Sequence, residues 1–183
     1  MWRRRKAWCW SVGRLARCGL AAFALLASAP AACAQSFPAD DLRVLTRVLG
    51  FVQPHVVGTV AIAYVAGNSA SRADAEAIAR LIGDGITVGS ATLPPKVVEI
   101  GAVATAGAAV VIPAAGANGR ELGDAARAAH ALCVTTDTAA VLAGQCTVAI
   151  RREPRVEIIV NHAAAAAAGI EFATAFRMMI REI

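Results

Sequence analysis

Residues 108–136, AAVVIPAAGANGRELGDAARAAHALCVTT, decide the fold of this chain. The stretch begins with the apolar run 108–113, which is typical of a buried strand, and a Gly-containing loop over 114–118 follows. Residues 120–132 then carry apolar side chains at helical spacing, and the run 133–136 predicts a second strand. A strand, a helix and a strand in this order form a βαβ unit, which places the two strands parallel in one sheet.

The residues before this unit continue the same alternation. Residues 59–66, TVAIAYVA, predict a buried strand, and residues 69–82 predict a helix capped by Ser69 or Ser71. Further upstream, apolar residues at spacings of three and four predict an amphipathic helix over 41–52. Two short strand segments are expected at 86–91 and 97–101.

The residues after the unit predict a change of strand direction. A brief helix is expected over 138–143. Residues 146–151 and 155–161 read as two strands separated only by a short turn, and so short a connection makes them an antiparallel hairpin. Residues 162–183 predict a terminal helix with a bend or break at Gly169.

This order of elements predicts an α/β sandwich. We expect a single domain with a largely parallel sheet, an antiparallel C-terminal hairpin and flanking helices. The arrangement resembles one lobe of a periplasmic binding protein. The domain is expected to span residues 35–183, a length that supports one hydrophobic core.

Residues 1–34 have the three zones of a cleavable signal peptide. A basic segment, MWRRRKAWCWSVGRLAR, precedes an apolar run over 18–29, and small residues at 32–34 suit a peptidase that cuts after Ala34. A retained anchor is the alternative, but a spanning helix needs about 20 apolar residues and this run is shorter. Acylation of Cys33 would need a Leu-like residue where Pro30 stands. We therefore expect export to the periplasm and no membrane span after cleavage.

Loss of the signal peptide changes the charge of the chain. The net charge of +5 arises from 18 basic and 13 acidic residues, and six of the basic ones lie before residue 35. The remaining domain has 12 basic against 13 acidic residues, and the three Trp residues also leave with the signal peptide. Neither a basic surface nor base-stacking aromatics remain in quantity, so nucleic acid is not an expected partner.

Two cysteines remain in the predicted mature domain. The other three of the five lie in 1–34, which leaves Cys133 and Cys146 in an oxidising compartment, where a disulfide is the direct interpretation. Two buried free thiols are one alternative. A metal site with His130 and His162 is another, but the spacing fits no zinc motif. We expect no metal and no cofactor.

A binding site is expected where the parallel strands end. The loops over 67–69, 115–119 and 135–137 would meet at the carboxyl edge of the sheet, where their free N–H groups suit a small anion. Ordinary turn and cap chemistry is the competing explanation of these residues. The candidate residues for binding a ligand or partner are Asn68, Ser69, Asn118, Asp137 and Asn161.

No pattern in the chain predicts catalysis. His55, His130 and His162 share no local motif with a nucleophile, and no GxSxG, HExxH or P-loop pattern occurs. We therefore expect a protein that is not an enzyme. Most apolar residues of the terminal segment should be core, although Met178 and Met179 could instead extend a partner surface.

The last 50 residues or so, beginning LCVTTDTAAVLAGQC, resemble the C-terminal half of the YfiR family of periplasmic regulatory proteins. The matching pieces are the strand end 134–137, Gly144, the hairpin strand 155–161 that ends in Asn, and the Ala-rich segment 163–169. Upstream the resemblance is one of architecture. This chain has Phe-Val-Gln-Pro at 51–54, where the family commonly has Trp-Pro.

The resemblance implies a non-enzymatic regulator. Such a protein binds the periplasmic sensor domain of an inner-membrane diguanylate cyclase and holds it inactive, and its disulfide tunes it to redox conditions. A homodimer is compatible with this expectation. The alternative is a small-ligand-binding periplasmic protein associated with a transporter or a sensor. A small hydrolase would need the histidines and a nucleophile to converge in space.

Overall fold

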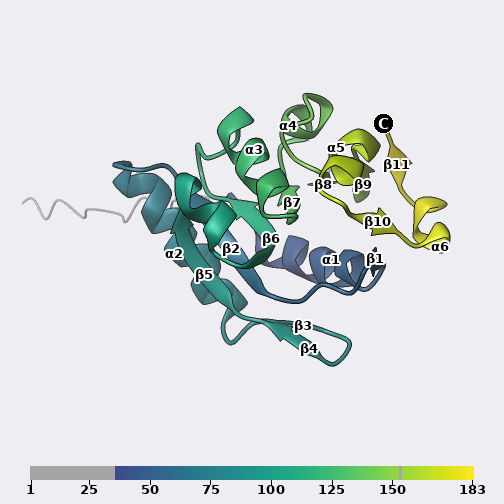
Figure 1. Ribbon diagram of the computed structural model, residues 1–183, viewed down its shortest axis with the longest axis horizontal. Helices are drawn as coiled ribbons and strands as arrows, with labels where there is room; N and C mark the ends of the chain where they lie inside the picture. The colour runs from purple at the N-terminus through teal and green to yellow at the C-terminus, as the bar shows by residue number, and fades with distance from the viewer. Residues whose placement is uncertain (1–35, 153) are drawn as a thin grey trace, which may run out of the picture. The chain divides into compact units, whose positions relative to one another are not determined.

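A computed structural model describes residues 36–152 and 154–183 (Figure 1). The signal peptide predicted over 1–34 lies outside these residues, so its cleavage stays a prediction. The described part forms a seven-stranded sheet with helices on both faces, and the strand order is β11-β9-β8-β7-β6-β2-β5. The predicted α/β fold with a largely parallel sheet is confirmed.

Five neighbouring strands of the sheet run parallel, as the βαβ pattern predicted. They are β5 (Pro95–Glu99), β2 (Thr59–Tyr64), β6 (Ala108–Pro113), β7 (Leu132–Thr135) and β8 (Val148–Arg151). All six residues of β6 are buried, and burial of an apolar side chain such as Ile112 contributes about 1.5–3 kcal/mol. The centre of the sheet is therefore the core of the domain.

The predicted antiparallel hairpin is confirmed at one end of this sheet. Strand β9 (Glu157–Val160) pairs antiparallel with β8, and the two-residue strand β11 (Arg181–Glu182) pairs parallel with β9. In the turn of the hairpin, Nε of Arg152 lies 2.5 Å from Oδ1 of the buried Asp41, at the N-terminal end of the first helix. This ion pair holds the hairpin against that helix.

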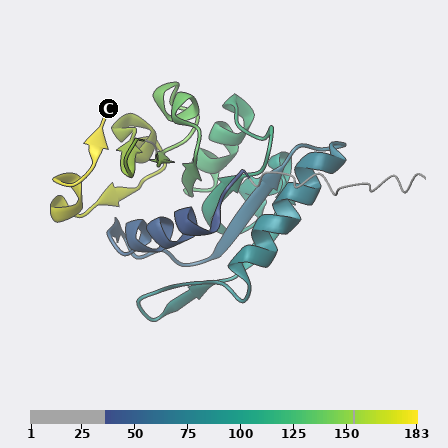
Figure 2. The same cartoon turned by 180° about the vertical axis from the view of Figure 1, so that it is seen from behind.

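Helices cover both faces of the sheet (Figures 1 and 2). Helices α1 (Ala39–Leu49) and α2 (Ser69–Ile82) pack against one face in a shared apolar cluster. Helices α3 (Arg120–Ala128) and α4 (Thr138–Leu142) cover the other face together with the 3-10 helix η1 (Ile100–Thr105). The domain thus has two hydrophobic layers, one on each side of the sheet.

Two predictions in the middle of the chain need correction. Residues 86–91 are not one strand: β3 (Ile86–Val88) and β4 (Ala91–Leu93) form a separate antiparallel hairpin, because the chain reverses at Gly89, whose φ is 59°. The helix predicted over 120–132 ends at Ala128, and Leu132 already belongs to β7. The edge segment expected at 97–101 is confirmed as β5, which begins at Pro95.

The largest correction concerns the C-terminal segment. The predicted break at Gly169 is confirmed, because α5 (His162–Ala167) ends before this residue, whose φ is 72°. The helix expected to continue to residue 183 is wrong. Three short elements follow α5, namely β10 (Glu171–Phe172), α6 (Thr174–Arg177) and β11. The segment folds back because β10 pairs with β1 (Val52–Gln53) and Phe176 stacks on Phe51, with ring centroids 5.0 Å apart.

Candidate functional site

The carboxyl edge of the sheet brings together four of the predicted binding residues, but each of them either forms a cap or turn or is simply exposed. Asn68 accepts a hydrogen bond from the N–H of Ser71 as the cap of α2, in place of the Ser69 or Ser71 cap that was predicted. Residue type allows either Asp137 or Thr138 as the cap of α4, and the structure has Asp137 in this role. Asn118 accepts a hydrogen bond from the hydroxyl of Thr135. Ser69 is exposed in the first turn of α2.

Ser36, the first residue that the structure describes, lies against this edge. Oδ1 of Asp74 accepts from the N–H of Ser36 at 3.2 Å, and its Oδ2 accepts from the Ser36 hydroxyl at 2.5 Å. The same Oδ2 accepts from the N–H of Ala115 at 2.8 Å, while Thr136 donates to the carbonyl of Ser36. We call this arrangement the Ser36 latch. It ties α2 and the loops after β6 and β7 together where the anion was expected.

Asn161, the fifth predicted binding residue, lies at the opposite edge of the sheet. It follows β9, which runs antiparallel to β8, so it is separated from the loops after β2, β6 and β7. Its Oδ1 accepts from the N–H of Ala164 as the cap of α5, and its Nδ2 donates to the carbonyl of Val141. Both ends of its amide therefore support local structure.

The predicted disulfide is present between Cys133 and Cys146. Their Cα atoms lie 5.0 Å apart, and the bond links the start of β7 to the segment before β8. Both residues are buried, with 1% and 3% of their surface exposed, in the apolar cluster beneath α3. The alternative metal site is not formed: within the described residues no three His, Cys, Asp or Glu side chains are placed to hold an ion.

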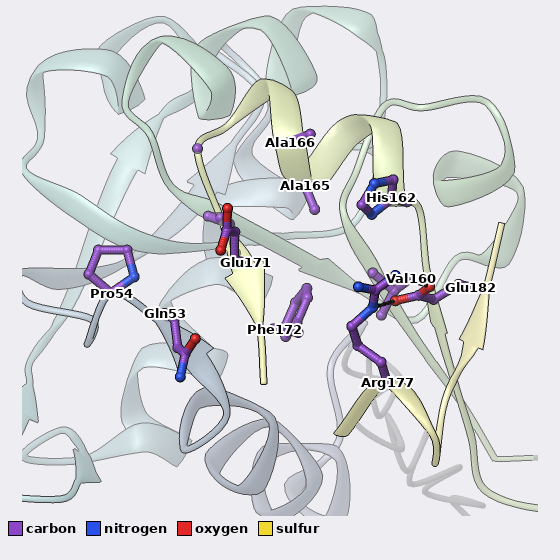
Figure 3. Close-up of a pocket in the computed structure, with 12 residues that line it drawn as sticks. Gln53, Pro54, Val160, His162, Ala165, Ala166, Glu171, Phe172, Arg177 and Glu182 are labelled. Carbon is purple, nitrogen blue, oxygen red and sulfur yellow. Dashed lines mark hydrogen bonds and ion pairs between the residues drawn. The ribbon is translucent and has the colours of Figure 1, made fainter. Parts of the chain in front are cut away.

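A cavity of about 570 Å³ lies between α5, β10, α6 and β11 (Figure 3). We call it the Phe172 cavity. Its apolar side includes Val160, Ala165 and Phe172, and its polar groups come from the side chains of Gln53, His162, Glu171, Arg177 and Glu182. Sequence reasoning missed it, because a continuous terminal helix would not have brought residues 171, 177 and 182 around one hollow.

One ion pair dominates the charge of the Phe172 cavity. Nε and Nη2 of Arg177 donate to the two carboxylate oxygens of Glu182 at 2.7 and 3.0 Å. The hydrogen bond from Arg177 lowers the pKa of Glu182 below its ordinary value and raises that of the guanidinium. Among the described residues Glu171 has no ion-pair partner, so it offers the cavity a carboxylate that can accept a donor from a ligand.

A second cavity, of about 370 Å³, adjoins the first and shares Gln53, Pro54, Gly169 and Ile170 with it. His55 and His130 line this second cavity, so all three histidines of the chain lie along the two hollows. In the described part of the chain, the residues that line these two cavities include no Ser, Thr or Cys. Mixed polar and apolar walls of this kind suit reversible binding of a small amphipathic molecule.

Exposed apolar side chains gather beside the end of the sheet. Val156, Met178 and Met179 have 61%, 86% and 66% of their surface exposed, and we call them the apolar patch. Met179 and Val156 line a groove of about 510 Å³ between β9 and the α6–β11 segment. The two methionines are therefore surface residues, whereas Phe176 of the same segment is core, as predicted.

Residues 36–152 and 154–183 contain no helix that is long and apolar enough to cross a bilayer.

No protein-family model and no curated protein matches the chain. Two solved structures are similar: an ABC domain in complex with L-Trp from Streptococcus pneumonia, and a conserved domain protein from Vibrio cholerae O1 biovar El Tor.

The two structures align with this chain at TM-scores of 0.53 and 0.52, and their sequences are 12% and 14% identical to it. The alignments cover 80% and 79% of this chain. This chain spans 62% and 59% of the length of those chains. Such similarity shows the fold alone. It supports the predicted α/β fold with a largely parallel sheet.

Proposed function

We propose that this chain is a non-enzymatic periplasmic regulator. It binds the periplasmic sensor domain of an inner-membrane signalling protein of the diguanylate cyclase type and represses it. The observation that carries the proposal is the apolar patch, because side chains as apolar as Val156, Met178 and Met179 are rarely left exposed together without a binding role. Methionine suits such a surface, since its flexible thioether adapts to the partner.

The resemblance to the YfiR family supports the same assignment. It covers residues 133–183, and this segment builds β7, β8, β9 and all of the elements around the patch. The part of the chain that is most similar to the family therefore coincides with the part that carries the exposed apolar side chains. A protein-binding surface in this region fits a regulator that works by contact.

The proposed location supports this role. Export and removal of residues 1–34 would release a domain whose Cys133–Cys146 disulfide is stable in an oxidising compartment. Sequencing of the natural protein's N-terminus should find Gln35 first, in a periplasmic fraction. A cytosolic protein that starts at Met1 would contradict both the location and the proposed partner.

The repressor role is tested in the cell that makes the protein. Removal of the chain should raise the cellular level of cyclic di-GMP, and re-expression of the full chain should restore it. A version that lacks residues 1–34 serves as the control, because it stays in the cytoplasm and should not restore repression. An unchanged cyclic di-GMP level after removal of the chain would contradict the proposal.

A second candidate function is the binding of a small ligand, for which the Phe172 cavity is the specific observation. Its aromatic wall and its Glu171 carboxylate, which has no ion-pair partner among the described residues, match the amino group and side chain of an amino acid or a similar amphipathic molecule. The Streptococcus pneumonia domain of the same fold is in complex with L-Trp, which makes L-Trp a suitable first probe. A ligand at 100 times its Kd stabilises a protein by about 2.7 kcal/mol. An L-Trp concentration series that leaves Tm unchanged would remove this probe as a ligand.

A further inference from the structure

We propose that the partner enters as an apolar segment that carries a carboxylate and lies in the groove between β9 and the α6–β11 segment. We call this groove the edge groove. It is lined by Arg155, Val156, Glu157, Ile158, Met179, Ile180 and Arg181. This inference rests on the proposed function, and it goes further by naming the surface and the chemistry of the segment that fits it.

The edge groove lies at the end of the sheet, where a strand still has a free side. Within the described residues β11 is the last strand, and it pairs only with β9. The N–H of Ile183 donates to the carbonyl of Val160, and the carbonyl of Ile183 accepts from His162. Backbone groups alternate in direction along a strand, so those of Glu182 face away from β9. These backbone groups lie on the side of β11 that faces away from the edge groove, so a segment in the groove would bind through its side chains and not by adding a strand.

The floor of the edge groove is part of the hydrophobic core. Ile158 and Ile180 are half-buried and pack against the same apolar cluster as α1. Val156 and Met179 also line the groove, and their exposed side chains form its rim. An apolar side chain that enters the groove would cover this rim and rest on a supported floor, which is the arrangement typical of an interface centre.

The arginine side chains around the edge groove favour an occupant that carries a carboxylate. Among the residues that the structure describes, Arg181 forms no ion pair, because Glu157 pairs with Arg151 and Glu182 pairs with Arg177. Arg155 adds a second guanidinium to the lining. A carboxylate on the incoming segment would pair with Arg181, and an arginine favours such a partner because its planar group binds both oxygens.

The same charges disfavour a second copy of this chain as the occupant. A symmetric dimer through this edge would bring Arg155 and Arg181 of one copy toward the same residues of the other. Juxtaposed like charges oppose association. An acidic segment of a different protein is therefore the better fit.

The test is photo-crosslinking in the cell that makes the protein, with a photoreactive residue in place of Met179 in the full chain. The matched control carries it at Val57, which is 80% exposed and does not line the edge groove. Position 179 should form an adduct with the periplasmic part of a membrane protein, through an apolar peptide that contains Asp or Glu. Arg181→Glu should lower the yield of this adduct roughly tenfold, whereas Arg181→Lys should retain most of it.

The remaining outcomes are distinct from one another. An adduct with a second copy of the chain, or an adduct that is equally strong with Arg181→Glu, would overturn the inference. An adduct from position 57 but not from 179 would also overturn it while leaving the proposed regulator intact. If neither position gives an adduct and cyclic di-GMP does not respond to removal of the chain, the inference and the proposed function both fail.

Discussion

The hydroxyl of Ser36 donates to Oδ2 of Asp74 at 2.5 Å, across 38 positions of the chain. The contact places the start of the described domain over the carboxyl edge of the sheet, where open α/β folds commonly bind their ligands. Asp74 is only 8% exposed, and its two oxygens accept three hydrogen bonds in all. Ser36 thus contacts the loops at the carboxyl edge, and the Phe172 cavity lies elsewhere, around α5 and β10.

Asp74→Ala should destabilise the domain by about 1–3 kcal/mol, because it leaves the N–H of Ala115 and the donors of Ser36 without an acceptor. Ser36→Ala removes one donor and should cost about 1 kcal/mol. Urea unfolding measures both values. Asp84→Ala, in the exposed turn after α2, is the matched control and should change little. Equal stability of the Asp74 and Asp84 variants would show that the Ser36 latch is not a stabilising contact.

Replacement of both Cys133 and Cys146 by Ala should lower the free energy of unfolding by about 3 kcal/mol, since the bond closes a loop with a sequence separation of 13. Because both residues are buried, a reductant should reach the bond only when α3 and its surroundings open. Alkylation and mass spectrometry would follow this reaction. Reduction of the folded domain as fast as that of an unfolded control would instead favour an exposed redox switch.

Glu182 should titrate below its ordinary pKa of 4.5, because Arg177 hydrogen-bonds its charged form. A lowered pKa stabilises the fold above 4.5, and this contribution is lost as the pH falls through the pKa of the folded state. This loss of stability at low pH should be confined to α6 and β11. Carboxyl NMR titration of the parent and of Arg177→Met measures it. The pKa of Glu182 should rise in the variant, and an equal pKa in both proteins would contradict the assignment.

Most of the strands and helices up to the hairpin could be predicted because their signals are local. The run at 108–113 is buried along its whole length, and the turn between 151 and 157 is too short for any connection except an antiparallel one. The cap at Asp137 and the disulfide likewise follow from residue type and position. Each of these features is decided within a few residues.

The C-terminal segment could not be predicted in the same way. Residues 163–168 are a run of Ala with high helical propensity, and the apolar residues after Gly169 predict further helix. Its actual structure depends on the pairing of β10 with β1 and on the stacking of Phe176 on Phe51, which are distant in sequence. The Phe172 cavity and the edge groove form only because the C-terminal segment packs against residues that are distant in sequence. A local sequence pattern therefore could not predict them.

Met179→Glu is the most direct test of the regulator proposal. It places a charge on the exposed rim of the edge groove and leaves the buried core unchanged. Val57→Glu, at an apolar residue outside the patch that is 80% exposed against 66% for Met179, is the matched control.

The decisive measurement is the cellular level of cyclic di-GMP in cells that lack the natural chain and express one variant or the other in equal periplasmic amounts. The Val57→Glu variant should hold the level as low as the parent chain does, and the Met179→Glu variant should lose most of the repression. Full repression by Met179→Glu would contradict the claim that the apolar patch is the regulator's contact surface.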